Sequence, residues 1–236
     1  AFENYGSGKT ETPFRESAPR VPGENFYYTL EDIMFAKAGR DGFSWNVHRP
    51  HTVIGYARGN AMNMGVTLAV YASICKATGK PFTFPGSQVQ WNALTDLTDS
   101  LVLARQMEWA ATTPGAHNEA FNTVNGDVFR WRRLWHEIGE FFELEVADCP
   151  ETPQPLETQM ADIAPTWAEI VENNELVEAD VSKLASWWHT DADLGRELEC
   201  VNDVTKSRDF GFDHFRETRA ALFDLFTRLR AERIIP

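Results

Sequence analysis

The sequence predicts an α/β fold followed by a mainly helical part. Helical and strand patterns alternate up to about residue 125, and nearly every pattern after that point is helical. At 236 residues and 43% hydrophobic composition, the chain can bury a large core. No apolar run approaches the roughly 18 residues that a membrane span needs, and a charged fraction of 24% is ordinary for a globular protein. We therefore expect a folded, soluble protein without a transmembrane segment.

The first two elements are a helix and a strand. Apolar side chains recur at helical spacing over residues 26–37, and Gly39 and Gly42 close that segment. Apolar and polar side chains then alternate over residues 43–48, which predicts a strand that Pro50 ends. A strand this apolar needs partner strands for its backbone groups. Because the chain offers few of them, we expect further strands of the sheet upstream.

Three more elements complete the alternating part. Residues 62–78 form a strongly apolar helical pattern that Gly79 ends. Residues 97–111 predict an amphipathic helix, with Asp96 or Asp99 as its N-cap. Residues 118–123 predict a short strand. After these elements the helical patterns of the later part cover residues 127–142, 167–173, 182–188 and 214–232.

The charge pattern limits the partners of the chain. The 22 Lys and Arg against 35 Asp and Glu give a net charge of −13, and the stretch from Leu134 to Ser182 contains no Lys or Arg. An acidic, solvated face of this kind argues against nucleic acid or an anionic membrane there, since phosphates need cations. Three widely spaced cysteines and an N-terminus without a basic or apolar leader favour the cytoplasm.

Common site motifs are absent from the sequence. The six histidines show no HExxH spacing and no Cys-x-x-Cys is present, so we expect no metal site. The sequence also has no GxGxxG and no GxSxG. Gly6 to Thr10 resembles the end of a phosphate-binding loop, but Glu3 stands where that loop needs glycine. The eight tryptophans are expected to pack in the core and between parts, with a platform for a flat apolar substrate as the alternative.

A series of ordered motifs carries a family resemblance. The segment NFYYTLED starts the first predicted helix, and WNVHRP spans the strand that follows it. Further motifs are Met62-Asn63, VYASICK at 70–76, FPG at 84–86, NEAFN at 118–122 and NGDVF at 125–129. Together they resemble the progesterone 5β-reductase and iridoid synthase family, atypical extended short-chain dehydrogenases. The likeness runs from Phe2 to Pro236.

The resemblance implies the C-terminal part of a Rossmann-type extended short-chain dehydrogenase, with the N-terminal dinucleotide-binding half missing. Residues 1–125 would be the remainder of the Rossmann-type domain with the active-site tyrosine helix, and residues 126–236 a mainly helical substrate-binding cap. Ordinary short-chain dehydrogenases carry a lysine one helical turn after their tyrosine. Here Glu31 and Asp32 stand at those positions. The family's lysine would lie just before Ala1.

The resemblance also implies the chemistry, an NADPH-dependent reduction of a carbon–carbon double bond conjugated to a carbonyl. The catalytic residue would be Tyr27, whose phenol stabilises charge developing on the carbonyl oxygen. The cofactor NADPH would meet Tyr27, Val53, Asn60, Ala61 and Met62. We expect the chain alone to be inactive.

An enone or enal would be the small-molecule partner, facing Phe2, Tyr5, Thr52, Met62 and His189. His189 stands where the plant enzymes commonly carry phenylalanine, which makes that end of the pocket more polar. A non-catalytic binding or assembly fragment stays open as an alternative, as does a related epimerase, dehydratase or carbonyl reductase. The oligomeric state stays open too, with a homodimer among the options.

Overall fold

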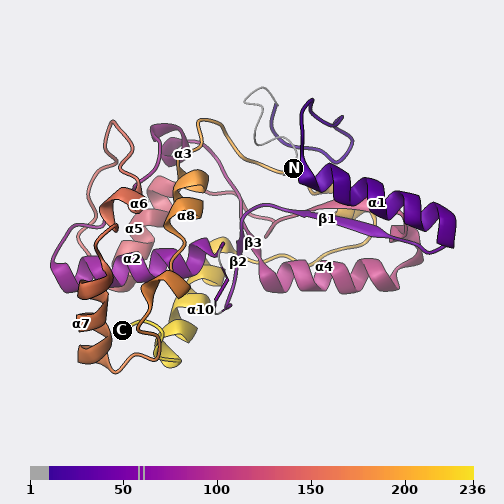
Figure 1. The fold of residues 1–236 in the computed structure, drawn as a ribbon. Coiled ribbons are helices and arrows are strands. Elements are labelled where there is room, and N and C mark those ends of the chain that lie inside the picture. Colours follow the sequence, from indigo (N-terminus) through magenta and orange to yellow (C-terminus); the bar gives the residue numbers. More distant parts are fainter. Residues whose placement is uncertain (1–10, 58, 61) are drawn as a thin grey trace.

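The computed structural model describes residues 11–57, 59–60 and 62–236, and Figure 1 shows two groups of elements with short strands between them. One group holds α1 (Phe26–Asp41), β1 (Asn46–Pro50), α4 (Ser100–Thr112) and β4 (Glu119–Thr123). The other is built from helices, and β2 (Val53–Ile54) and β3 (Thr98–Asp99) lie where the two groups meet.

The helix α1 begins and ends at local signals. The Asn25 side chain caps it by accepting the N–H of Tyr27 at 2.9 Å. Gly42 ends it in a left-handed conformation with φ of 75°, where its N–H donates to the carbonyl of Ala38. The helix predicted over residues 26–37 is therefore confirmed and extends to Asp41.

The strands β1 and β4 pair in parallel, with Val47 opposite Ala120. Alternate side chains of β1 reach opposite faces of this ribbon. On one face Trp45 packs against Phe35 of α1, and on the other His48 Nδ1 lies 2.8 Å from Gln106 Oε1 of α4. The parallel pairing and the helix on each face confirm an α/β fold of Rossmann type. The predicted strand starts three residues too early, because residues 43–45 precede the ladder.

The strands β2 and β3 were not predicted. Each has two residues, which is too short to produce a periodic pattern, and they pair in parallel through Val53 opposite Thr98. The predicted start of the following helix at residue 97 is wrong, because Thr98 and Asp99 belong to β3. Asp99 caps that helix by accepting the N–H of Leu101 at 2.8 Å, so α4 begins at Ser100.

The helix-rich group surrounds α2 (Met64–Thr78), whose residues 64–75 are all buried. Asn63 caps it and Gly79 ends it, so the predicted helix is confirmed with a start two residues later. Around α2 pack four later helices. They are α5 (Trp131–Phe142), α7 (Ala164–Asn174), α8 (Trp187–Leu194) and α10 (Thr218–Ala231). The predicted boundary near residue 125, between the remainder of the Rossmann-type domain and the helical cap, stays a prediction.

Three predicted helix starts are wrong, two of them because contacts between distant residues precede the helix. Phe129 exchanges two backbone hydrogen bonds of 2.9 Å with Thr95, so α5 begins only at Trp131. Asp127 accepts the N–H of Thr218 at 2.9 Å, which places the start of α10 there. Residues 181–183 form a 3₁₀ turn instead of a helix, and α8 follows from Trp187. The shorter helices of the described residues are α3 (Gln88–Asn92), α6 (Leu156–Gln159), α9 (Thr205–Asp209) and a 3₁₀ turn at Pro114–Ala116.

The core is aromatic at its centre. Trp135 is fully buried and stacks on Phe82 with ring centroids 4.1 Å apart and planes 2° apart. Trp131 and Trp167 are also buried, which confirms the predicted core role for these three tryptophans, whereas Trp188 is 53% exposed. Among the described residues no helix combines the length and apolar character that a bilayer crossing requires. Within the same ranges no three metal-binding side chains are grouped as a cation site.

Candidate functional site

The direction of α1 relative to β1 decides where Tyr27 lies. Phe35 and Trp45 have ring centroids 4.6 Å apart, and Glu31 forms an ion pair with Arg49 at 3.0 Å. Going from Phe35 to Glu31 is one turn toward the start of α1, while going from Trp45 to Arg49 is toward the end of β1. The helix and the strand therefore run in opposite directions. Tyr27 is one further turn back on the same face as Glu31, so it lies beyond Arg49, toward the carboxyl end of β1. Ligands of open parallel sheets bind at this end.

The two adjacent tyrosines have different environments. The Tyr28 side chain is buried, its hydroxyl accepts the N–H of Val21 at 2.9 Å, and the guanidinium of Arg20 lies 4.6 Å from its ring centroid. Tyr27 is 37% exposed and packs against Phe26 with centroids 4.2 Å apart. Partial burial raises the pKa of Tyr27 further above neutral pH, where an ordinary phenol is already protonated and can donate. The geometry thus separates a buried, hydrogen-bonded Tyr28 from a partly exposed Tyr27.

The carboxylates that replace the usual lysine are engaged in ion pairs. Glu31 bridges Arg49 at 3.0 Å and Arg20 at 2.9 Å, and Asp32 binds Arg20 at 2.8 Å. These pairs fix α1 to β1 and to the segment that precedes the helix. Carboxylates therefore stand at the two positions where ordinary short-chain dehydrogenases would place a lysine.

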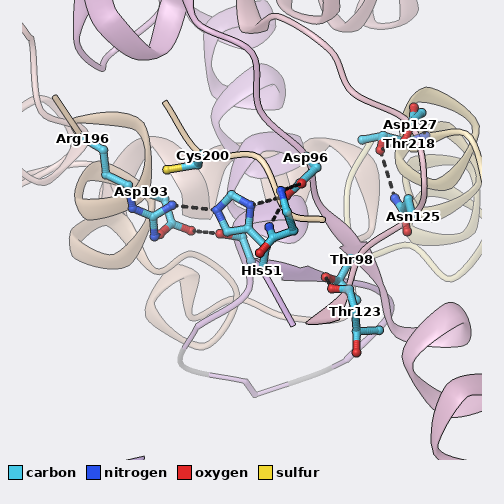
Figure 2. A network of polar contacts seen from close by, with 12 residues as sticks. His51, Asp96, Thr98, Thr123, Asn125, Asp127, Asp193, Arg196, Cys200 and Thr218 are labelled. Carbon is cyan, nitrogen blue, oxygen red and sulfur yellow. Dashed lines mark hydrogen bonds and ion pairs between the residues drawn. The ribbon is translucent and has the colours of Figure 1, made fainter. Parts of the chain in front are cut away.

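A polar network fills the carboxyl end of β1, as Figure 2 shows. His51 lies 2.7 Å from Asp96 through Nδ1 and 2.9 Å from Arg196 through Nε2. The hydroxyl of Thr52 donates to Asp193 at 2.8 Å. Residues that follow β1 are therefore held by residues at the end of α8, more than a hundred positions later.

Two residues predicted to face a substrate meet at Asp193. Its Oδ2 accepts the Thr52 hydroxyl and lies 3.9 Å from Nε2 of His189. The Nδ1 of His189 is buried without a hydrogen-bond partner in the described structure. The structure thus brings Thr52 and His189 together, although the hydroxyl of Thr52 is committed to Asp193.

The predicted cofactor-contacting segment lies after β1. Val53 is half-buried in β2, where it pairs with Thr98. Asn60 is exposed and its side chain accepts the N–H of Met62 at 2.9 Å, which forms a turn, and the Met62 side chain is 53% exposed. Both side chains are accessible from solvent. The remaining predicted site residues, Phe2, Tyr5 and Ala61, lie outside the described residues.

Sequence reasoning missed the acidic and basic residues of the network. Asp96 was considered only as a helix cap, and Asp193 and Arg196 lie in a region without a recognisable motif. Asp96 and Asp193 are buried, which is unusual for aspartates without partners, but burial is not readable from an isolated position. Only their distant partners reveal their role.

The comparisons with known proteins show the family of the chain. A family model described as a PRISE-like Rossmann-fold domain matches residues 3–236. The (S)-8-oxocitronellyl enol synthase CYC2 of Camptotheca acuminata is 40% identical over 239 residues. The 3-oxo-Delta(4,5)-steroid 5-beta-reductase of Arabidopsis thaliana is 35% identical over 237 residues. Each alignment covers 100% of this chain but 61% of the relative, so the chain spans about three fifths of their length.

Solved structures show the same fold at low identity. UDP-glucose 4-epimerase of Thermotoga maritima, solved with UDP-glucose, has a TM-score of 0.59 at 14% identity, covering 96% of this chain and 60% of its own. RMD of Pseudomonas aeruginosa, solved with NADPH, has a TM-score of 0.57 at 12% identity, covering 97% and 63%. With the fold, the ordered motifs and a family match over residues 3–236, the chain belongs to the PRISE-like Rossmann-fold domain family.

Proposed function

We propose that this chain provides the catalytic tyrosine and the substrate-binding cap of an NADPH-dependent reductase of α,β-unsaturated ketones or aldehydes. The observation that supports the proposal is the pair of tyrosines at the start of α1, where Tyr27 is 37% exposed and Tyr28 is buried with its hydroxyl bound to Val21. The names of the relatives, an enol synthase and a steroid 5-beta-reductase, support this chemistry.

The role of Tyr27 follows from the charge that develops in such a reaction. When bound, the reduced nicotinamide supplies a hydride to the β-carbon, and the electrons of the double bond move onto the carbonyl oxygen. A phenol that is still protonated can donate a hydrogen bond to that oxygen, where the bond is stronger in the enolate-like transition state than in the ground state. The phenol carries this proton at neutral pH, because the ordinary pKa of tyrosine is about 10 and partial burial raises the pKa of Tyr27. Loss of one such donor typically costs about 3 kcal/mol of transition-state stabilisation.

One end of the cofactor has candidate contacts in this chain. The exposed Asn60 and Met62 follow the half-buried Val53 in the segment after the carboxyl end of β1, and we propose that this segment contacts the nicotinamide end. The chain has no GxGxxG turn for the phosphates. We therefore propose that the 236-residue chain alone does not turn over, and that reduction needs a nucleotide-binding half as well. Cytoplasmic location and a homodimer stay predictions.

The test compares two neighbouring tyrosines in a polypeptide that joins this chain to a complete nucleotide-binding half. Tyr27→Phe should lower kcat for an enone about a hundredfold, which corresponds to about 3 kcal/mol, and should leave the Kd for NADPH unchanged. Tyr28→Phe is the matched control, because it removes a hydroxyl from the same helix turn without touching the proposed site. Equal losses in both variants, or loss of NADPH binding in Tyr27→Phe, would contradict the proposed role.

Product analysis separates the remaining alternatives. Saturation of the double bond supports the proposal, whereas an alcohol that retains the double bond would indicate a carbonyl reductase. If the joined polypeptide binds an enone but forms no product, the chain is a non-catalytic binding fragment. Robust turnover by the 236-residue chain alone, verified by its intact mass, would contradict the need for a second half.

A further inference from the structure

The helix α1 exposes three large apolar side chains on one of its faces. Phe26, Leu30 and Ile33 are 63%, 52% and 51% exposed. They follow one another at intervals of four and three residues, which places them on one helix face, and the exposed Lys37 continues that face four residues later. Isolated exposed apolar residues are ordinary, whereas a contiguous apolar patch rimmed by polar residues marks an interaction site. We call these four residues the α1 stripe.

The α1 stripe lies away from the packed side of the helix. Tyr28, Glu31 and Ala38 are the buried residues of α1. At about 100° per residue, the centre of their face is about 140° around the helix from the centre of the stripe. Figure 1 shows α1 along the outside of its group, with β1 between α1 and α4. The apolar side chains of the stripe are therefore directed away from the sheet, where a second molecule can reach them.

The stripe matches a second copy of itself when two α1 helices pack in opposite directions. A twofold axis that passes between residues 31 and 32 places Leu30 of one copy opposite Ile33 of the other. The same axis places Phe26 opposite Lys37, whose alkyl chain can lie on the aromatic ring with the ammonium near its face. Because such an interface uses one patch twice, each of these contacts occurs twice. One stripe can therefore cover the apolar residues of the other.

The charges that border the stripe favour the same arrangement. Glu24 precedes the helix, and both Glu24 and Lys37 are exposed and form no ion pair among the described residues. Arg40, the other cation near the end of the helix, already binds Asp41 at 2.6 Å. In the antiparallel pair, Glu24 lies two residues before Phe26 and hence close to Lys37 of the other copy. A parallel pair would instead place Lys37 against Lys37, which is unfavourable.

We propose that the α1 stripe is an interface between two copies of this chain, with the two α1 helices packed antiparallel. Burial of Phe26, Leu30 and Ile33 supplies the attraction, and the contacts between Glu24 and Lys37 select the direction. One helix face is smaller than the about 800 Å² that each partner of a standard interface buries, so we expect a reversible dimer with a micromolar Kd. The interface does not use Tyr27, so its test is independent of the proposed function.

Sedimentation equilibrium of the 236-residue chain tests the interface. Between about 1 and about 200 µM the chain should shift from monomer to dimer. Leu30→Asp should raise the dimer Kd by at least about tenfold, because each carboxylate would then lie in the apolar centre of the contact. Met107→Asp is the matched control and should leave the Kd unchanged, because Met107 is also 52% exposed but lies on α4. Both side chains are exposed, so both variants should fold, which circular dichroism verifies.

A charge reversal tests the direction of the two helices. Glu24→Lys or Lys37→Glu alone should weaken the dimer several-fold, because each change places like charges beside one another. The two changes together should restore the wild-type Kd, since the opposite charges meet again with their places exchanged. A double reversal that fails to restore the dimer would refute the antiparallel arrangement.

Three further results would overturn the proposal. They are a chain that stays monomeric over this concentration range, a dimer that Leu30→Asp leaves intact, and equal weakening by Leu30→Asp and Met107→Asp. The nucleotide-binding half is the other candidate occupant of the stripe. If the chain alone is monomeric and Leu30→Asp prevents it from associating with a separately produced nucleotide-binding half, the stripe belongs to that contact instead.

Discussion

Trp135 should be one of the most costly side chains to remove from the helix-rich group. Its side chain is fully buried, it stacks on Phe82, and its ring contacts those of Tyr71 and Phe84. Its indole N–H also donates to the carbonyl of Phe82 at 3.1 Å. Truncation of a buried tryptophan to alanine typically costs about 3–5 kcal/mol, and the unpaired carbonyl adds about 1 kcal/mol. We expect Trp135→Ala to lower the free energy of unfolding by about 5 kcal/mol.

Urea unfolding followed by circular dichroism measures this loss. With a denaturant slope of about 3 kcal/mol per molar urea for a chain of this size, the midpoint should fall by about 1.7 M. Trp188→Ala is the matched control, because this tryptophan is 53% exposed, and its midpoint should move by less than about 0.3 M. A drop of less than about 0.5 M for Trp135→Ala, or equal drops in the two variants, would refute the assignment of Trp135 to the core.

Other predictions test the packing of α8, the cysteines and the tyrosine pair. A Cβ on Gly86 would lie 2.1 Å from the carbonyl oxygen of Leu194, so Gly86→Ala should destabilise by roughly 1–3 kcal/mol in thermal unfolding. Gly115→Ala meets no atom within 4 Å and should change stability by less than about 1 kcal/mol; equal effects would contradict the close approach. Burial raises the pKa values of Cys75 and Cys200 to about 11, so at pH 8 iodoacetamide should modify the half-buried Cys149 first. Peptide mass spectrometry checks that order, and labelling of Cys200 as fast as Cys149 would refute it. Tyr28→Phe leaves the N–H of Val21 without its acceptor and should cost about 1–2 kcal/mol in urea unfolding, and an unchanged midpoint would argue against that bond.

Local signals predicted the longer helices well. Asp99, one of the two caps considered for its helix, and the glycines at 42 and 79 are read from single positions, because each satisfies backbone groups within one turn of its own helix. The helix starts at 131 and 218 could not be read in this way. Their positions depend on Thr95 and Asp127, which are distant in sequence and reach the helix only in the folded chain.

In the candidate site, too, some features are local in the sequence and others depend on contacts between distant residues. The motif around Tyr27 is a property of the sequence, and it selected one tyrosine out of five. That Tyr28 is the structural partner follows only from its contacts with Val21 and Arg20 in the folded chain.

The sequence by itself determined the α/β class, the order of the main elements and the family, because periodicity, caps and ordered motifs are local in the chain. Only the tertiary structure decided that His51, Asp96 and Arg196 form one buried network and that Thr52 and His189 meet at Asp193. Such contacts join residues up to 145 positions apart. Their stability comes from excluding water around paired charges, and no single segment of the sequence contains both partners.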